Sequence, residues 1–365
     1  MKNGKTLVEL AQEIERQAAS KKDYVADTSA LEMVTGARTD DLAAPALKIA
    51  GNGTLAINDL AHRQIGEHVG VPAKYYDRMR AEAPDLLATN VNRWMHDKPA
   101  KRMVRTLDGR ARAFLSDRYR PLENIDLAEA AIPALQRLGG VTIISTEITE
   151  RRLYIKAVDQ RVVEQVGTRR VVNGKLVTYD DVCPTICISN SEVGMGALSI
   201  EVGMFTHECR NMALFRESSL RKHHVGGRMD LTDQVQAMLS DQTKNLTDAA
   251  TWAQVRDVVA GAFDPAAFKG RIQRLEEMVE DKIEGDPVKV VELTSRKLNF
   301  TEGEQKSVLR HLIEGSDLSR YGLFNAITRT AEDLADYDRA TDFERAGGAV
   351  IELGRSEWRE LAEAA

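Results

Sequence analysis

Helical and strand patterns alternate in the first hundred residues. Leu7, Leu10 and Ile14 are apolar and lie three and four positions apart, which predicts an N-terminal helix. The segment ALKIAGNGTLAI, residues 46–57, predicts a hairpin, because the glycines and asparagine at its centre accept positive φ angles. Three further short helices are predicted, over residues 58–69, 72–83 and 84–97.

A strand-rich stretch follows. Met103–Leu115 predicts a hairpin turning at Asp108 and Gly109, and DLAEAAIPALQRL predicts a helix that ends at Gly139. Alternating residues predict four more strands, over residues 141–149, 151–158, 185–193 and 197–209. Residues 162–182 are either a polar loop or a long hairpin. We expect an antiparallel sheet of about six strands with a packed helix.

The last third of the chain has helical periodicity throughout. Thr301 and Glu304 have the spacing of a capping box, and Ser316 or Asp317 is expected to cap the next helix. The fold class is therefore predicted to be α+β. Three regions are expected: a helical and hairpin connector (1–100), a basic antiparallel core (101–228) and an acidic helical domain (229–365).

Charge is distributed unevenly between these regions. The whole chain carries a net charge of −6, but residues 229–365 hold 17 Lys and Arg against 27 Asp and Glu, a net of −10. Residues 1–228 hold 33 against 29, a net of +4. The basic residues of this part fall in three clusters, within 101–120, 151–175 and 210–228. Such clusters are typical of a polyanion site if folding gathers them on one face.

The sequence favours a cytoplasmic location. The N-terminus lacks the apolar run of a signal peptide, and no segment approaches the length of a membrane span. We therefore expect no membrane partner. Cys183, Cys187 and Cys209 cannot form a disulfide framework in a chain of 365 residues, which fits a reducing compartment.

Cysteine and histidine also suggest a metal site, because thiolate and imidazole are preferred zinc ligands. Cys183 and Cys187 lie on an apolar strand, about 13 Å apart if it is regular, so buried thiols explain them more simply. His207, Cys209 and His223 remain candidates for a metal-assisted hydrolase. No nucleotide-binding loop or nucleophile elbow occurs, so we predict neither a cofactor nor enzymatic activity.

Basic residues interleaved with aromatics favour nucleic-acid binding. Arginine can bind phosphate while an exposed ring stacks on a base, a combination used for single strands. The predicted nucleic-acid-binding residues are Arg105, Arg110, Arg112, Arg118, Tyr119, Arg120, Arg151, Arg152, Lys156, Arg221 and Lys222.

Several segments resemble the phage/plasmid-like protein family, a domain of unknown function numbered 932. These are AINDLAHRQIGEHVGVPAKYYDRM, NVNRWM, AFLSDRYRPLENIDL and SRYGLFNAITRTAEDL, which together extend from about residue 55 to 350. The resemblance implies a mobile-element protein and carries no established activity. The order of hairpin, helix and strands is also similar to that of phage single-strand annealing proteins of the RecT, Erf and Redβ kind. That similarity implies a basic groove that holds a single strand along a ring or filament of subunits.

The leading hypothesis is a mobile-element protein that binds single-stranded DNA as a homo-oligomer and promotes annealing without nucleotide hydrolysis. Its acidic helices would contact other subunits or a host protein. The first alternative is an anti-restriction protein that engages a host protein through those helices, where Glu276, Glu277 and Glu280 would act. The second is the metal-assisted hydrolase.

Overall fold

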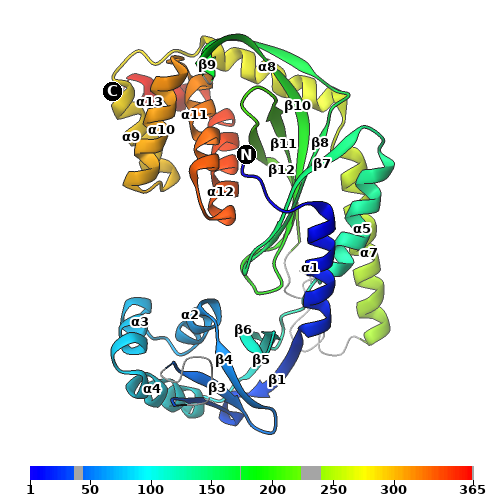
Figure 1. The fold of residues 1–365 in the computed structure, drawn as a ribbon, viewed down its shortest axis with the longest axis vertical. Helices are drawn as coiled ribbons and strands as arrows, with labels where there is room; N and C mark the ends of the chain where they lie inside the picture. The colour runs from blue at the N-terminus through cyan, green and yellow to red at the C-terminus, as the bar shows by residue number, and fades with distance from the viewer. Residues whose placement is uncertain (37–43, 173, 223–239, 364–365) are drawn as a thin grey trace.

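The computed structural model describes residues 1–36, 44–172, 174–222 and 240–363. It shows the predicted α+β fold, with two sheets placed one after the other along the chain (Figure 1). The first sheet and three helices form the lower part of Figure 1, here called the N-terminal lobe. The second sheet lies between helices in the upper part, here called the C-terminal lobe. No helix in the described ranges is long and apolar enough to cross a membrane.

The N-terminal lobe is a six-stranded sheet in the order β1-β5-β6-β4-β3-β2. Its strands are β1 (Lys22–Asp27), β2 (Leu31–Val34), β3 (Ala46–Ile49), β4 (Gly53–Ile57), β5 (Lys101–Leu107) and β6 (Arg110–Ser116), with a short 3-10 turn at Thr28–Ala30. The helices are α2 (Asp59–His68), α3 (Ala73–Glu82) and α4 (Pro84–Asp97). Apolar residues of strands and helices, such as Leu47, Ile65 and Val91, form one fully buried core.

The hairpin β5–β6 was expected in the same sheet as the later strands, and this expectation is wrong. β5 pairs with β1, and β6 pairs in parallel with β4 over two residues, so the hairpin completes the N-terminal sheet. Its turn has the predicted form, since Asp108 and Gly109 both have positive φ angles. Local pattern fixes a hairpin's turn, but it does not say which other strand lies beside the hairpin.

The C-terminal lobe contains the second sheet, in the order β12-β11-β10-β8-β7, with β9 paired to the first half of β10. Its strands are β7 (Val141–Ile148), β8 (Leu153–Asp159), β9 (Glu164–Val172), β10 (Lys175–Asn190), β11 (Leu198–Thr206) and β12 (Asn211–Lys222). β9 pairs with residues 175–182 of β10, so this part of the chain is a hairpin rather than a polar loop. One sheet face is apolar, through Ile155, Ile188 and Ile200, and packs on α1 (Leu7–Ser20), α5 (Asn124–Arg137) and α7 (Asp241–Gly261).

The remaining helices cover the other face and the end of this sheet (Figure 1). They are α8 (Pro265–Glu280), α9 (Pro287–Leu298), α10 (Glu302–Gly315), α11 (Arg320–Asp333), α12 (Tyr337–Ile351) and α13 (Arg355–Glu363). The capping box of Thr301 and Glu304 is confirmed. The predicted cap at Ser316 or Asp317 is wrong, because Ser319 caps α11 and Ser316 ends α10 in the left-handed conformation.

Gly348 allows α12 to approach the sheet closely. A Cβ atom at this position would lie 1.9 Å from the carbonyl oxygen of Leu214 in β12. This contact is with backbone, so relief requires movement of the helix or the strand. The glycine therefore sets the distance between α12 and the sheet face on which the helix lies.

We predict opposite effects for alanine at two helical glycines. Gly348→Ala should lower the free energy of unfolding by about 1–3 kcal/mol, because the methyl group forces α12 away from β12. Gly270→Ala in α8, where a Cβ meets nothing within 4 Å, should raise it by about 0.5–1 kcal/mol through helix propensity. Urea unfolding measures both values. Equal effects of the two substitutions would contradict this account of α12 packing.

Candidate anion-binding site

Two of the predicted nucleic-acid-binding arginines lie buried between the lobes. Arg105 is 1% exposed and donates hydrogen bonds to Asp23 (2.8 Å), Glu123 (2.6 Å) and the carbonyl of Glu192 (2.9 Å). Arg112, also buried, donates to the carboxylate of Glu192 at 2.7 Å. Both guanidinium groups are therefore occupied by the protein itself, and we correct their assignment to the nucleic-acid surface.

These contacts form what we call the interlobe ion cluster: Lys21, Asp23, Arg105, Arg112, Glu123 and Glu192. Lys21 contributes by pairing with both glutamates. Burial and the adjacent Glu192 raise the pKa of Glu123. Burial opposes ionisation of Glu192 as well, but hydrogen bonding with Glu123 and the charges of Arg112 and Lys21 hold its pKa well below the usual range. The carboxylate of Glu192 is thus the stable negative centre of the cluster.

Lys156 was also predicted to bind nucleic acid, and this prediction is corrected because the residue is buried. Its side chain is fully buried beneath α12, and Nζ donates to the carboxylate of Glu344 at 2.6 Å and to Thr341 at 3.1 Å. Burial alone would lower the pKa of this lysine, but the adjacent Glu344 carboxylate outweighs burial and raises it. Lys156 therefore fastens α12 to the sheet.

Other predicted residues are spread over the surface. Arg110 and Arg118 are exposed, and Arg120 pairs with Asp248 of α7 at 2.6 Å. The Tyr119 hydroxyl donates to the carbonyl of Ser191 at 2.8 Å, so its ring is anchored rather than presented to a base. Lys222 ends β12, and its side chain lies outside the described set.

Arg152 and Arg221 are brought together, although 69 positions separate them in the sequence. Both line a cavity of about 360 Å³ at one end of the second sheet. Arg345 of α12 is the third guanidinium there, and Gly196, Ala197, Ser199 and Glu201 complete the lining. We call this cavity the arginine pocket. Arg151, the neighbour of Arg152, is half-buried and accepts a hydrogen bond from Ser191 through its carbonyl.

The chain holds the three arginines in different ways. Arg345 contacts both carboxylate oxygens of Glu201, the shortest contact being 2.7 Å. Arg221 is 51% exposed and lies 3.9 Å from the same carboxylate, a weak contact. Arg152 donates twice to the carbonyl of Met195 and has no carboxylate partner among the described residues. The guanidinium groups of Arg152 and Arg221 are therefore held in position, but their positive charges are only partly neutralised.

Part of the pocket wall comes from the β10–β11 loop, residues 191–197, through Gly196 and Ala197. Gly196 lies directly against Arg152, since a Cβ there would be 2.3 Å from its Nη2 atom. The same loop carries Glu192 of the interlobe ion cluster. Because one short segment contributes to both, the position of the pocket wall depends on the contacts between the lobes.

Sequence reasoning missed Arg345 and Ser199. Arg345 belongs to the acidic C-terminal third and to none of the three basic clusters. Ser199 lies on an apolar strand without a recognisable motif. Strand register brings it beside Arg221, its direct partner across β11 and β12. Only the register and the packing of α12 reveal this grouping.

The thiols and imidazoles do not gather into one site. Cys183 and Cys187 are fully buried, and the Cys183 sulfur lies 3.1 Å from Nε2 of His207. Burial raises the pKa of Cys183 to about 11, and that of Cys187 to about 12, so both remain thiols. His223 lies outside the described residues, and within the described ranges no three metal-ligating side chains cluster.

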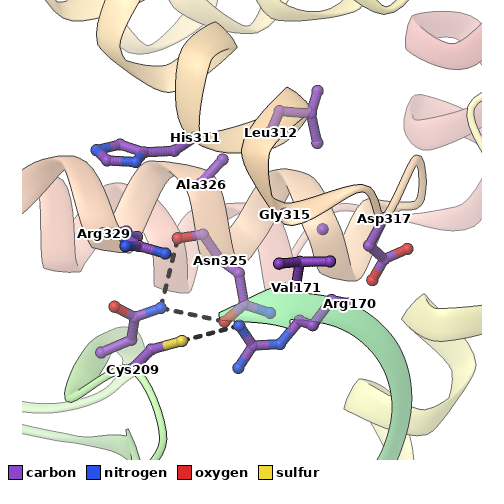
Figure 2. Close-up of a pocket in the computed structure, with 12 residues that line it drawn as sticks. Arg170, Val171, Cys209, His311, Leu312, Gly315, Asp317, Asn325, Ala326 and Arg329 are labelled. Atoms are coloured by element: carbon purple, nitrogen blue, oxygen red, sulfur yellow. Dashed lines mark hydrogen bonds between the residues drawn. The ribbon is translucent and has the colours of Figure 1, made fainter. Parts of the chain in front are cut away.

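Cys209 borders a second pocket, between β9, α10 and α11 (Figure 2). Figure 2 shows its sulfur against the guanidinium of Arg170, at 2.8 Å. Burial raises the pKa of Cys209 despite this cation, which disfavours a reactive thiolate. The cavity measures about 20 Å³, room for one water molecule, so it offers little space for a substrate.

Comparison of the chain with family models, curated proteins and solved structures finds no match. The resemblance to the phage/plasmid-like family therefore stays a prediction.

We predict that the interlobe ion cluster stabilises the fold. Glu192→Gln should lower the free energy of unfolding by about 3–5 kcal/mol, because it leaves Arg112 buried without its counter-charge. Glu82→Gln is the control, because it makes the same substitution in an exposed ion pair, that of Glu82 with Arg78. It should change the free energy of unfolding by less than about 1 kcal/mol. Urea unfolding of both variants provides the test. A loss below 1 kcal/mol for Glu192→Gln would show that the cluster is not needed for stability.

Proposed function

We propose that this chain binds single-stranded nucleic acid and that the arginine pocket holds phosphate of the strand. The observation that carries the proposal is the convergence of Arg152, from the second basic cluster, with Arg221, from the third. Planar guanidinium groups bind phosphate oxygens in pairs, and such contacts supply much of the affinity for nucleic acid.

The pocket supports phosphate contacts more than base stacking. Tyr119, the ring expected to stack, donates its hydroxyl to Ser191, and Phe114 of the basic hairpin is buried in the N-terminal core. Affinity should therefore arise chiefly from charge and decline steeply with salt. Annealing by a ring or filament of subunits is the activity that we propose for a protein binding a strand in this way.

We predict that Arg152→Ala/Arg221→Ala weakens oligonucleotide binding by about tenfold or more at low salt, because two phosphate contacts are lost. The slope of log affinity against log salt should decrease by about 1 for each contact. Fluorescence anisotropy with a labelled single strand, and then with a duplex, measures both quantities.

Two controls separate this site from a general charge effect. Arg296→Ala removes an exposed arginine of α9 outside the pocket and should leave affinity nearly unchanged. Neutralising Glu276, Glu277 and Glu280, which are exposed on α8, tests the host-protein alternative and should not weaken DNA binding. The absence of oligonucleotide binding by the unaltered protein at low salt would overturn the proposed function.

A further inference from the structure

The arginine pocket contains a buried hydroxyl group that has no partner among the described residues. Ser199 is 6% exposed, lines the cavity, and its Oγ atom makes no hydrogen bond with the described residues. A buried polar atom left without a partner costs about 1–3 kcal/mol, so such atoms usually have a ligand or water to bind. The position of Ser199 in the lining indicates that this ligand occupies the pocket.

The charge of the lining indicates what kind of ligand fits. Among the lining residues, three guanidinium groups face one carboxylate, that of Glu201, which leaves two positive charges in excess; outside the lining, Arg345 also pairs with Asp342 at 3.1 Å. Arg345 is neutralised by Glu201 and by the half-exposed Asp342, so the positive charge open to a ligand lies with Arg152 and Arg221. A phosphodiester within a strand carries one negative charge, whereas a terminal phosphate group carries about −1.5 to −2 at pH 7. The terminal group matches the charge of Arg152 and Arg221, the two arginines open to a ligand.

The number of hydrogen-bond donors in the pocket also favours a terminal phosphate. A terminal phosphate presents three free oxygens, one more than an internal phosphodiester. Arg152, Arg221 and the hydroxyl of Ser199 provide three separate donors around one cavity. At about 360 Å³ the cavity falls within the range of small-molecule pockets, so it can hold the phosphate together with part of the terminal nucleotide.

We propose that the arginine pocket recognises a phosphomonoester, the phosphorylated end of a nucleic-acid strand. Arg152 and Arg221 bind its charge, and Ser199 donates a hydrogen bond to the third oxygen. Glu201 orients Arg345 at the base of the pocket. This inference depends on the proposed function and makes it more specific, since binding would begin at a strand end.

The test compares one labelled single strand carrying a 5′-phosphate, a 3′-phosphate or hydroxyl groups at both ends. The label is internal, so that both ends remain available. We expect one phosphorylated form to bind the full chain about tenfold more tightly than the hydroxyl form. Equal affinity for all three strands would overturn the inference and leave the proposed function standing.

A matched pair of serine variants locates the preference. Ser199→Ala should reduce the advantage of the phosphorylated strand and leave affinity for the hydroxyl strand unchanged. Ser189→Ala is the control, because Ser189 is the partner of Ser199 on β10, is also buried with no hydrogen-bond partner for Oγ among the described residues, and lies outside the pocket lining. The Ser189→Ala variant should prefer the phosphorylated strand as strongly as the unaltered protein does. A loss of preference in both variants, or in neither, would contradict the role of Ser199.

Free ligands distinguish a strand end from a soluble phosphomonoester. Calorimetry with a nucleoside 5′-monophosphate, and with inorganic phosphate, is performed on the unaltered protein and on Arg152→Ala. Monophosphate binding that Arg152→Ala abolishes, with no strand binding at all, would support the phosphomonoester site while overturning the proposed function. The absence of binding to any phosphate compound would overturn both.

Discussion

The interlobe ion cluster is the constraint on which the arrangement of this molecule depends. Arg105 and Arg112 belong to the N-terminal sheet, whereas Glu192 belongs to the β10–β11 loop of the C-terminal sheet. A buried charge without its counter-charge is costly, so these groups have to meet. The two lobes are therefore held at the segment that also contributes Gly196 and Ala197 to the wall of the arginine pocket. The lining of the arginine pocket and the orientation of the lobes therefore share one structural support.

A second set of buried charges attaches α12 to the sheet. Lys156 pairs with Glu344, and Glu201 pairs with Arg345, one helical residue further on. Arg345 thus faces the pocket because the helix is fixed in rotation by two adjacent ion pairs. Gly348 fixes its distance from β12. The acidic C-terminal third supplies the site with an arginine whose role is not apparent from the net charge of that region.

Local patterns predicted most of the elements but not their neighbours. The helix at 7–20, the hairpins at Gly51 and Asp108, and the capping box at Thr301 follow from spacing and turn chemistry, which act over a few residues. The sheet in which β5 and β6 lie depends on pairing with β1 and β4, which no local pattern specifies. Ser319 caps α11 in place of Ser316 because Ser316 is the left-handed residue that ends α10, and the first turn of α11 begins only at Arg320.

The same limit applies to the site. The basic clusters in the sequence predicted Arg152 and Arg221 as nucleic-acid-binding residues. They also predicted Arg105, Arg112 and Lys156, which are buried in ion pairs. An arginine at a surface and an arginine in a buried pair have the same local sequence signal. Burial depends on distant carboxylates, Glu192 and Glu344, and only the folded chain shows which arginine faces them.

The measurement that tests the central claim most directly is a crystal structure of the full chain with a phosphorylated single strand. We predict that the terminal phosphate lies between the guanidinium groups of Arg152 and Arg221, with one oxygen within hydrogen-bonding distance of Ser199 Oγ. A strand bound elsewhere, with the arginine pocket filled only by water, would contradict the account.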